Sequence, residues 1–141
     1  MAVLSLVDSL HAGLKDRLDT VSGLNAYADW PDSFHGDGAI VLDVVADGSE
    51  QTLGHSTLAM HEFEILVATS LAPGPAAALR RLNQYCDRSG AGSILAALWA
   101  DRTLGGVAIT LFAESWDRPD IEPINGLEFL GRRLPIRVWV P

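Results

Sequence analysis

The hydrophobic pattern near the start of the chain has a helical period. Between Val3 and Asp19, leucine and valine residues recur at three- and four-residue intervals, and Ser22-Gly23 follows directly. This spacing gathers the apolar side chains on one face of a helix, and the Ser-Gly pair is a typical stop signal. We therefore expect a first amphipathic helix over residues 3–19.

Two more helices are predicted in the middle of the chain. Pro73-Gly74-Pro75 opens the stretch 76–87, because proline is tolerated in a first helical turn. Its buried stripe is predicted to be Leu79, Leu82 and Cys86, with the arginines facing outward. Ser93 is a good N-cap for a short third helix over 94–100, in which we expect Trp99 to fill core space.

The remaining hydrophobic stretches have the two-residue period or branched composition of strands, which are predicted at 25–30, 39–45, 57–69, 107–114 and 128–140. In the last, Leu134, Ile136, Val138 and Val140 share one face. We expect this stretch to be one long strand or a bent pair, with a β-bulge at Gly131. In 57–69 the second face carries Glu62 and Glu64, so this face is expected to meet solvent or a partner. The polar stretch 46–56 is predicted to be a connection.

The predicted order is one helix, three strands, two helices and two strands. Strands clustered between helices favour an α+β fold, with a mixed or antiparallel sheet and helices packed on one face. A chain of 141 residues makes one ordinary domain, which we place over residues 1–141.

Charge is distributed unevenly along a chain whose formal net charge is −8. Residues 1–72 hold 11 acidic and 2 basic residues, a net of −9, whereas residues 73–141 hold 7 acidic and 8 basic residues, a net of +1. Binding to nucleic acid through its phosphates needs clustered Lys and Arg side chains. In a chain this acidic we therefore expect no specific nucleic-acid binding. The division fits an acidic face on one subunit that meets a less acidic face on the next.

The single cysteine, Cys86, cannot close an internal disulfide, and we interpret it as a small core residue of a protein built for the reducing cytoplasm. The N-terminal stretch lacks the long apolar run of a signal peptide, and no 18-residue apolar stretch predicts a membrane span.

One loop carries the best candidate chemistry. Asp29, Asp32, His35 and Asp37 lie within nine residues and could ligate a divalent cation in a small metal-dependent enzyme. Their spacing does not match an EF-hand, and aspartates are also what turns use to satisfy their own backbone. We favour the interpretation that these aspartates stabilise turns. The sequence also contains no nucleophile motif and no phosphate-binding loop. We therefore expect no catalytic, metal or cofactor site.

Aromatic and arginine residues outside the predicted core are more informative, because Trp and Arg are typical anchors of protein interfaces. Arg102 and Thr103 precede Gly105-Gly106 in a predicted turn. We expect this turn to shape the domain or a subunit contact; the alternative is a plain β-turn without a further role. The predicted interface residues are Trp30, Asp32, Phe34, Arg102, Thr103, Trp116, Arg133, Arg137 and Trp139.

Four stretches in this order resemble the tail terminator proteins of siphophages, especially those of actinobacteriophages. They are Val21-Ser22-Gly23-Leu24 with Tyr27-Ala28-Asp29-Trp30-Pro31-Asp32, then Ile94-Leu95-Ala96-Ala97-Leu98, then Ala100-Asp101-Arg102-Thr103-Leu104-Gly105-Gly106, and finally Asn125-Gly126-Leu127-Glu128-Phe129-Leu130-Gly131 before the closing strand. Together they extend across nearly the whole chain.

The resemblance implies a non-enzymatic virion protein that assembles in the host cytoplasm as a hexameric ring. Such a ring caps the head-proximal end of the tail tube, stops tube polymerisation and offers a surface to the head–tail connector. Its partners would be copies of itself, the major tail tube protein and a neck protein. A head-closure or other neck component of similar size, a monomeric binding module and the small metal enzyme remain alternatives.

Overall fold

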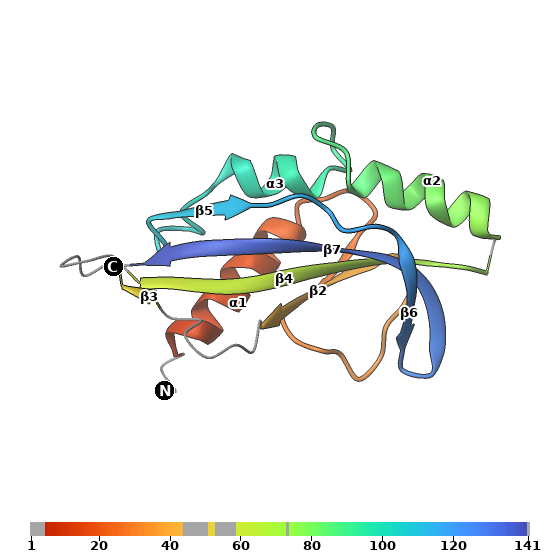
Figure 1. Ribbon diagram of the computed structural model, residues 1–141, viewed down its shortest axis with the longest axis horizontal. Helices are drawn as coiled ribbons and strands as arrows, with labels where there is room; N and C mark the ends of the chain where they lie inside the picture. The colour runs from red at the N-terminus through yellow and green to blue at the C-terminus, as the bar shows by residue number, and fades with distance from the viewer. Residues whose placement is uncertain (1–4, 44–50, 53–58, 73, 141) are drawn as a thin grey trace.

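A computed structural model of the chain shows one curled mixed β-sheet with three helices (Figure 1). It describes residues 5–43, 51–52, 59–72 and 74–140. The elements in chain order are α1 (Leu6–Leu18), β1 (Asn25–Tyr27), β2 (Gly38–Asp43), β3 (Gln51–Thr52), β4 (Ala59–Ser70), α2 (Pro75–Tyr85), α3 (Ile94–Ala100), β5 (Thr110–Ala113), β6 (Asp120–Ile124) and β7 (Leu127–Val140). The predicted α+β class is confirmed.

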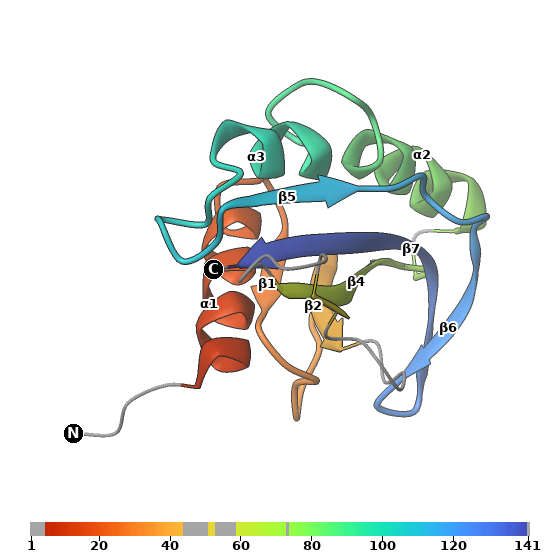
Figure 2. The ribbon, with the colours of Figure 1, turned by 60° about the vertical axis from the view of Figure 1, so that its left-hand side comes forward.

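The sheet is built around the long antiparallel pair β4 and β7. The strand order is β1-β2-β4-β7-β5, with β3 added to β4 and β6 added to β7, and only β1 and β2 run parallel. Because β4 occupies one edge of β7, both β5 and β6 pair with the other edge of β7. Strand β5 pairs with the C-terminal part of β7 and β6 with its N-terminal part. The sheet curls along β7 between these two partners (Figures 1 and 2).

All three helices pack on one face of this sheet, as predicted. The alternating apolar residues of β7 point into this core, and Leu134, Ile136 and Val138 are fully buried. The core residues that meet them are Leu10, Leu14 and Leu18 of α1, Phe63, Ile65 and Val67 of β4, Leu82 and Tyr85 of α2, and Ile94, Leu95, Ala97 and Leu98 of α3. The two-residue period of the strands and the helical period of α1 therefore determine the main core.

A second, smaller core lies on the opposite face. It is formed by Phe34, Ile40, Leu66, Ala68, Ile124 and Phe129. The β1–β2 loop and the β6–β7 hairpin contribute its outer side chains, and the rings of Phe34 and Phe129 meet edge to face with centroids 4.9 Å apart. The expectation that the second face of 57–69 meets solvent or a partner is therefore wrong for its Leu66–Ala68 half, which these two segments cover.

The β6–β7 hairpin was not predicted, although its signal is in the sequence. Asn125 and Gly126 form its two-residue turn with φ of 51° and 83°. Positive φ at both positions is what a type I′ turn requires, and Asn-Gly is the dipeptide that best satisfies it. The short and partly polar strand β6 lacks a clear alternation, which is why the hydrophobic pattern alone does not reveal it.

The β-bulge expected at Gly131 is absent. The register of β4 with β7 runs without interruption from Ala59 opposite Val140 to Ser70 opposite Phe129. Glycine is instead needed for space, since a Cβ at position 131 would lie 2.8 Å from Cγ of Glu122 and 3.1 Å from the carbonyl oxygen of Val67. Gly131 thus allows β6 and β4 to approach β7 closely where the sheet curls.

Several predicted boundaries shift. Ser5 caps α1 by accepting a hydrogen bond from the Asp8 amide, and the helix begins at Leu6. The predicted first residue, Val3, lies outside the described residues. In α2 the buried residues are Ala78, Leu82 and Tyr85, whereas the predicted Leu79 is 39% exposed. Cys86, also in the predicted stripe, is partly buried against the main core.

The strands β1 and β5 are shorter than predicted, and most of the connection predicted at 46–56 lies outside the described residues, apart from β3 at 51–52. Strand β5 begins only at Thr110 because the preceding turn is longer than the sequence indicated. In this turn Leu104, Gly105 and Gly106 all have positive φ, and the amide of Ala108 donates to the carbonyl of Thr103.

Replacing Gly106 with valine should lower the free energy of unfolding by about 1–2 kcal/mol, because its φ of 96° is a conformation that side chains with a Cβ rarely adopt. No atom lies within 4 Å of an added Cβ, so the cost is one of backbone conformation. Urea denaturation would measure it. Gly92→Val is the matched control, since Gly92 has equally open surroundings without a left-handed φ; equal losses in both variants would contradict the explanation.

Candidate interaction surface

The connection between β5 and β6 borders two hollows in the surface. It runs along the edge of β7 rather than away from it, because the amides of Glu114 and Asp117 donate to the carbonyls of Pro135 and Arg133, each at 2.9 Å. Trp116, between them, is partly buried against the main core. The connection thereby presents a tryptophan beside a sheet edge.

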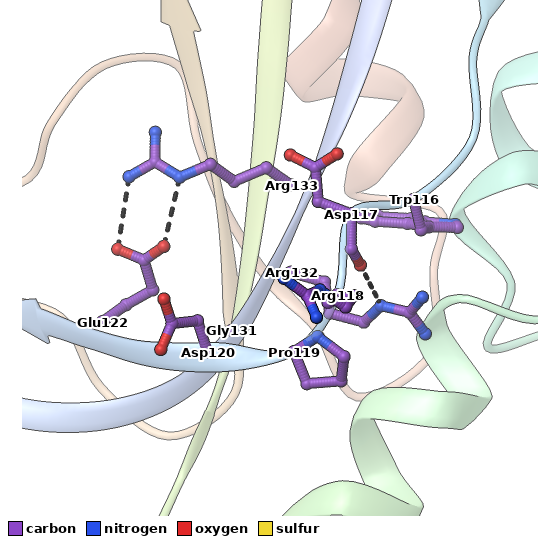
Figure 3. Close-up of a pocket in the computed structure, with 9 residues that line it drawn as sticks. All are labelled: Trp116, Asp117, Arg118, Pro119, Asp120, Glu122, Gly131, Arg132 and Arg133. Carbon is purple, nitrogen blue, oxygen red and sulfur yellow. Dashed lines mark hydrogen bonds and ion pairs between the residues drawn. The ribbon is translucent and has the colours of Figure 1, made fainter.

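A pocket of about 810 Å³ opens on one side of this tryptophan (Figure 3). We call it the Trp116 pocket, and it is lined by Trp116, Asp117, Arg118, Pro119, Asp120, Glu122, Gly131, Arg132 and Arg133. Arg133 is held at its wall by a two-pronged pair with Glu122, at 3.1 and 3.2 Å, and by Glu64 at 3.1 Å. A planar guanidinium held in this way is fixed in direction, and its charge is already neutralised.

A second hollow of about 790 Å³ lies on the other side of Trp116, between the sheet edge and the helices. We call it the α3 groove, and it is lined by Cys86, Arg88, Leu95, Trp99, Ala113, Glu114, Ser115, Trp116 and Arg132. Trp116 and Arg132 line both hollows, so the two form one continuous surface. Arg132 is braced there, since its Nε donates to the carbonyl of Asp117 at 2.7 Å.

The α3 groove has an excess of positive charge. Its one acid, Glu114, pairs with Arg137 at 3.0 Å, whereas within the described ranges the guanidinium of Arg88 forms no ion pair. Burial raises the pKa of the Cys86 thiol to about 12, so this thiol stays protonated at neutral pH and is a poor nucleophile. The groove is therefore suited to binding and offers no activated cysteine.

The structure brings only some of the predicted interface residues together. Trp116 and Arg133 meet in the Trp116 pocket. Arg137 and Trp139 lie on the second face of β7, and Trp30 and Asp32 lie in the β1–β2 loop. Arg88 and Arg132, which the sequence did not single out, complete the surface; their separation by more than forty residues gives no local signal.

Arg102 and Thr103 occupy the turn before β5 and act on its edge. The guanidinium of Arg102 donates twice to the carbonyl of Leu111, at 3.2 and 3.0 Å, and stacks 5.1 Å from the centre of the Phe112 ring. Thr103 donates to Asp101 at 2.7 Å. Arg102 thus caps a carbonyl on the free edge of the sheet.

Two aromatic residues have exchanged the roles expected of them. Phe34 is 6% exposed and packs in the second core between Tyr27 and Phe129, so it cannot contact a partner. Trp99, expected in the core, is 48% exposed at the rim of the α3 groove. The seven-residue helix α3 buries Ile94, Leu95, Ala97 and Leu98 on one face. Because Trp99 follows directly after Leu98, its side chain lies on the outward side of the helix.

The acidic loop 29–37 does not assemble a metal site. Asp37 turns inward, where Nε of Arg81 donates to it at 2.9 Å and the Tyr85 hydroxyl at 3.0 Å, whereas Asp32 is exposed. His35 bonds to Ser33 within the loop. In the part of the chain that the structure describes, no group of three or more His, Cys, Asp or Glu side chains is arranged to hold a metal ion.

Asp29 approaches a buried histidine that sequence reasoning did not identify. His11, 4% exposed, directs Nδ1 to the carbonyl of Ala28 and Nε2 to Asp43, the latter at 2.7 Å, and Asp29 lies 3.4 Å from Nδ1. Both principal partners can only accept, so both ring nitrogens must donate, which requires the imidazolium form. Burial alone would lower the pKa of His11, but these partners together raise it above 6.5.

The stability of the protein should therefore depend on pH through His11. Because the folded state binds this proton more tightly than the unfolded chain, the stabilisation is complete below about pH 6.5 and is lost as pH rises through the higher folded-state pKa. Comparison of wild type and His11→Gln by urea denaturation from pH 5 to 9 would measure it. The difference between them should shrink as pH rises; a difference that grows or stays constant would contradict the assigned charge.

Comparison of the sequence with models of known protein families and with curated proteins finds no match. Functional assignment therefore depends on the surface geometry and on the four sequence stretches described above. No helix among the described residues is long and apolar enough to cross a membrane.

Proposed function

We propose that this chain is a virion assembly subunit of the siphophage tail terminator type. Copies of it form a hexameric ring on the head-proximal end of the tail tube, stop tube growth and provide the surface that joins tail to head. The observation that carries the proposal is the continuous Trp116 pocket and α3 groove, an open surface lined by two tryptophans and braced arginines. Surfaces of this composition anchor protein–protein contacts.

Charge supports the same function. A net charge of −8 disfavours grip on the phosphate backbone, which suits a ring around a channel that must let DNA pass. The acidic first half and the less acidic second half of the chain are compatible with two surfaces of unlike charge on each subunit. A ring requires this difference, because each subunit must meet its neighbour through two unlike patches.

The rival metal-dependent enzyme would need the acids of loop 29–37, and of these Asp37 is engaged by Arg81 and Tyr85. A head-closure or neck protein would use similar surfaces. A terminator is distinguished from such a protein by the partner on which its ring assembles, which is the tail tube.

Light scattering coupled to size exclusion, followed by negative-stain imaging, tests the proposal. Wild type at micromolar concentration should give a species of six subunits of 15.1 kDa, about 91 kDa, with annular particles. Added to a polymerising tail tube protein encoded by the same genome, it should bind one tube end and arrest growth. A strict monomer at every salt concentration, or rings that bind only a portal or connector, would overturn the terminator assignment.

A further inference from the structure

We propose that the α3 groove receives the loop 29–33 of a second copy of this chain, so that copies join head to tail. We call this segment, Asp29-Trp30-Pro31-Asp32-Ser33, the Trp30 loop. The inference rests on the proposed self-assembly and adds to it which surface of one copy binds which segment of the next.

The groove has the shape and chemistry to accept an aromatic side chain flanked by acids. Leu95, Ala113 and the buried part of Trp116 give it apolar walls, and the half-exposed Trp99 stands at its rim. Its volume of about 790 Å³ lies within the range of about 300–1,000 Å³ over which concave sites bury compact ligands. The guanidinium of Arg88, which has no acidic partner among the residues described, adds a site for an incoming carboxylate.

The Trp30 loop has the complementary composition. Trp30 is 48% exposed and stands between Asp29, whose side chain is 81% exposed, and Asp32, also exposed. Asn125 donates to the carbonyl of Pro31 at 3.2 Å, which braces the loop against the β6–β7 turn. A braced loop loses little conformational entropy on binding, so its exposed indole is well prepared to enter a groove.

The loop and the groove lie on opposite sides of the molecule. The Trp30 loop follows β1, at one end of the strand order, and the groove borders β5, at the other end. In both ribbon views the β1–β2 loop lies across the sheet from α2 and α3 (Figures 1 and 2). A copy cannot fill its own groove from this position. Two unlike patches on one copy generate a head-to-tail contact, which closes into a ring when the rotation between neighbouring copies returns to the first copy.

The charges determine which pair to test. Asp29 lies beside the buried His11, which leaves Asp32 as the carboxylate of the loop that has no ion pair within the described residues. Arg132 is braced by the Asp117 carbonyl, whereas among the residues described the Arg88 guanidinium has neither an ion pair nor a side-chain hydrogen bond and is the cation of the groove more readily turned toward a partner. We therefore expect Asp32 of one copy to pair with Arg88 of the next.

Trp30→Ala should weaken self-association at least about 30-fold in Kd, the loss typical of a central aromatic anchor, without changing urea stability. Sedimentation velocity over a concentration series measures it. Leu6→Ala is the matched control, because Leu6 is 43% exposed on α1, outside both the loop and the groove. A Kd for Trp30→Ala equal to that of wild type would overturn the inference.

A charge exchange gives the sharper test. Asp32→Arg and Arg88→Asp should each weaken self-association about tenfold or more, because like charges then meet at every contact. An equimolar mixture of the two variants should regain wild-type assembly, since alternating copies restore an opposite-charge pair at each contact. The controls Asp16→Arg and Arg80→Asp change exposed residues of α1 and α2 in the same way and should leave assembly unchanged. A mixture that assembles no better than its components would overturn the pairing.

Photo-cross-linking separates failure of this inference from failure of the proposed function. With p-benzoylphenylalanine in place of Trp30, mixed with isotope-labelled wild type, cross-links should map to 86–99 or 113–116 of the labelled copy. If wild type forms rings but the cross-links map elsewhere, the groove assignment fails and the ring remains. If wild type does not assemble and the variant forms no cross-link to it, both the groove assignment and the proposed ring fail.

Discussion

Replacing Phe129 with alanine should lower the free energy of unfolding by about 3–5 kcal/mol. Its ring is 4% exposed and meets Phe34 edge to face, so truncation leaves a cavity in the small second core. That core holds the β1–β2 loop and the β6–β7 hairpin against the sheet. Chemical denaturation with urea, followed by tryptophan fluorescence, measures the loss.

Leu127→Ala is the control for this prediction, because Leu127 lies two residues earlier on the same strand and is 63% exposed. Its removal should change stability by less than about 0.5 kcal/mol. Similar losses in the two variants would mean that the second core contributes nothing beyond the hairpin itself.

Asp37→Ala should lower the free energy of unfolding by about 3 kcal/mol, the second-largest effect expected. Its carboxylate, 11% exposed, accepts from Arg81 and from the Tyr85 hydroxyl. Truncation removes the charged partner of Arg81 and leaves the two side chains only the carbonyls of Ser70 and Gly23 as acceptors. Asp37→Asn, which retains one oxygen acceptor, should lose less. The thermal midpoints of these variants, converted with the enthalpy of unfolding, give the comparison.

Asp32→Ala serves as the control for Asp37, since Asp32 is exposed in the same loop and should be nearly neutral for stability. The same series tests the metal alternative. Millimolar Mg²⁺ or Ca²⁺ should not raise the thermal midpoint of wild type; a rise that Asp37→Ala abolishes would restore the cation site and contradict the structural role assigned to this aspartate.

The periodic parts of the chain were predictable because each period reflects one buried face. Leu134, Ile136 and Val138 alternate along β7, and all three point into the core under the helices. Ser93 caps α3 as its side chain chemistry predicts, by accepting from the Ala96 amide at 3.1 Å. In such segments local backbone geometry and burial agree, so the pattern is sufficient.

The second core could not be predicted in the same way. Alternation shows which side chains share a face of β4, but not whether another segment covers that face. Phe34 in a loop and Phe129 on a distant strand meet only because the hairpin folds back. The turn that allows this, Asn125-Gly126, is a local signal of the sequence, because this dipeptide favours the positive φ angles of a type I′ turn.

The candidate surface depends still more on tertiary structure. Trp116 and Arg133 were identified from residue type alone, yet Arg88 reaches the same surface from the connection between α2 and α3, and Trp99 from α3, through packing. His11 shows the same limit, since its partners Ala28 and Asp43 lie 17 and 32 residues away.

The sequence by itself determined the class of fold, the order of the principal helices and strands and the buried faces of α1 and β7, because these follow from the period of apolar residues and from local capping chemistry. The tertiary structure alone decided which aromatic residues are buried, how the acids of loop 29–37 are used and which arginines border a groove. These properties depend on contacts between segments far apart in the chain, and curling of the sheet along β7 brings those segments together.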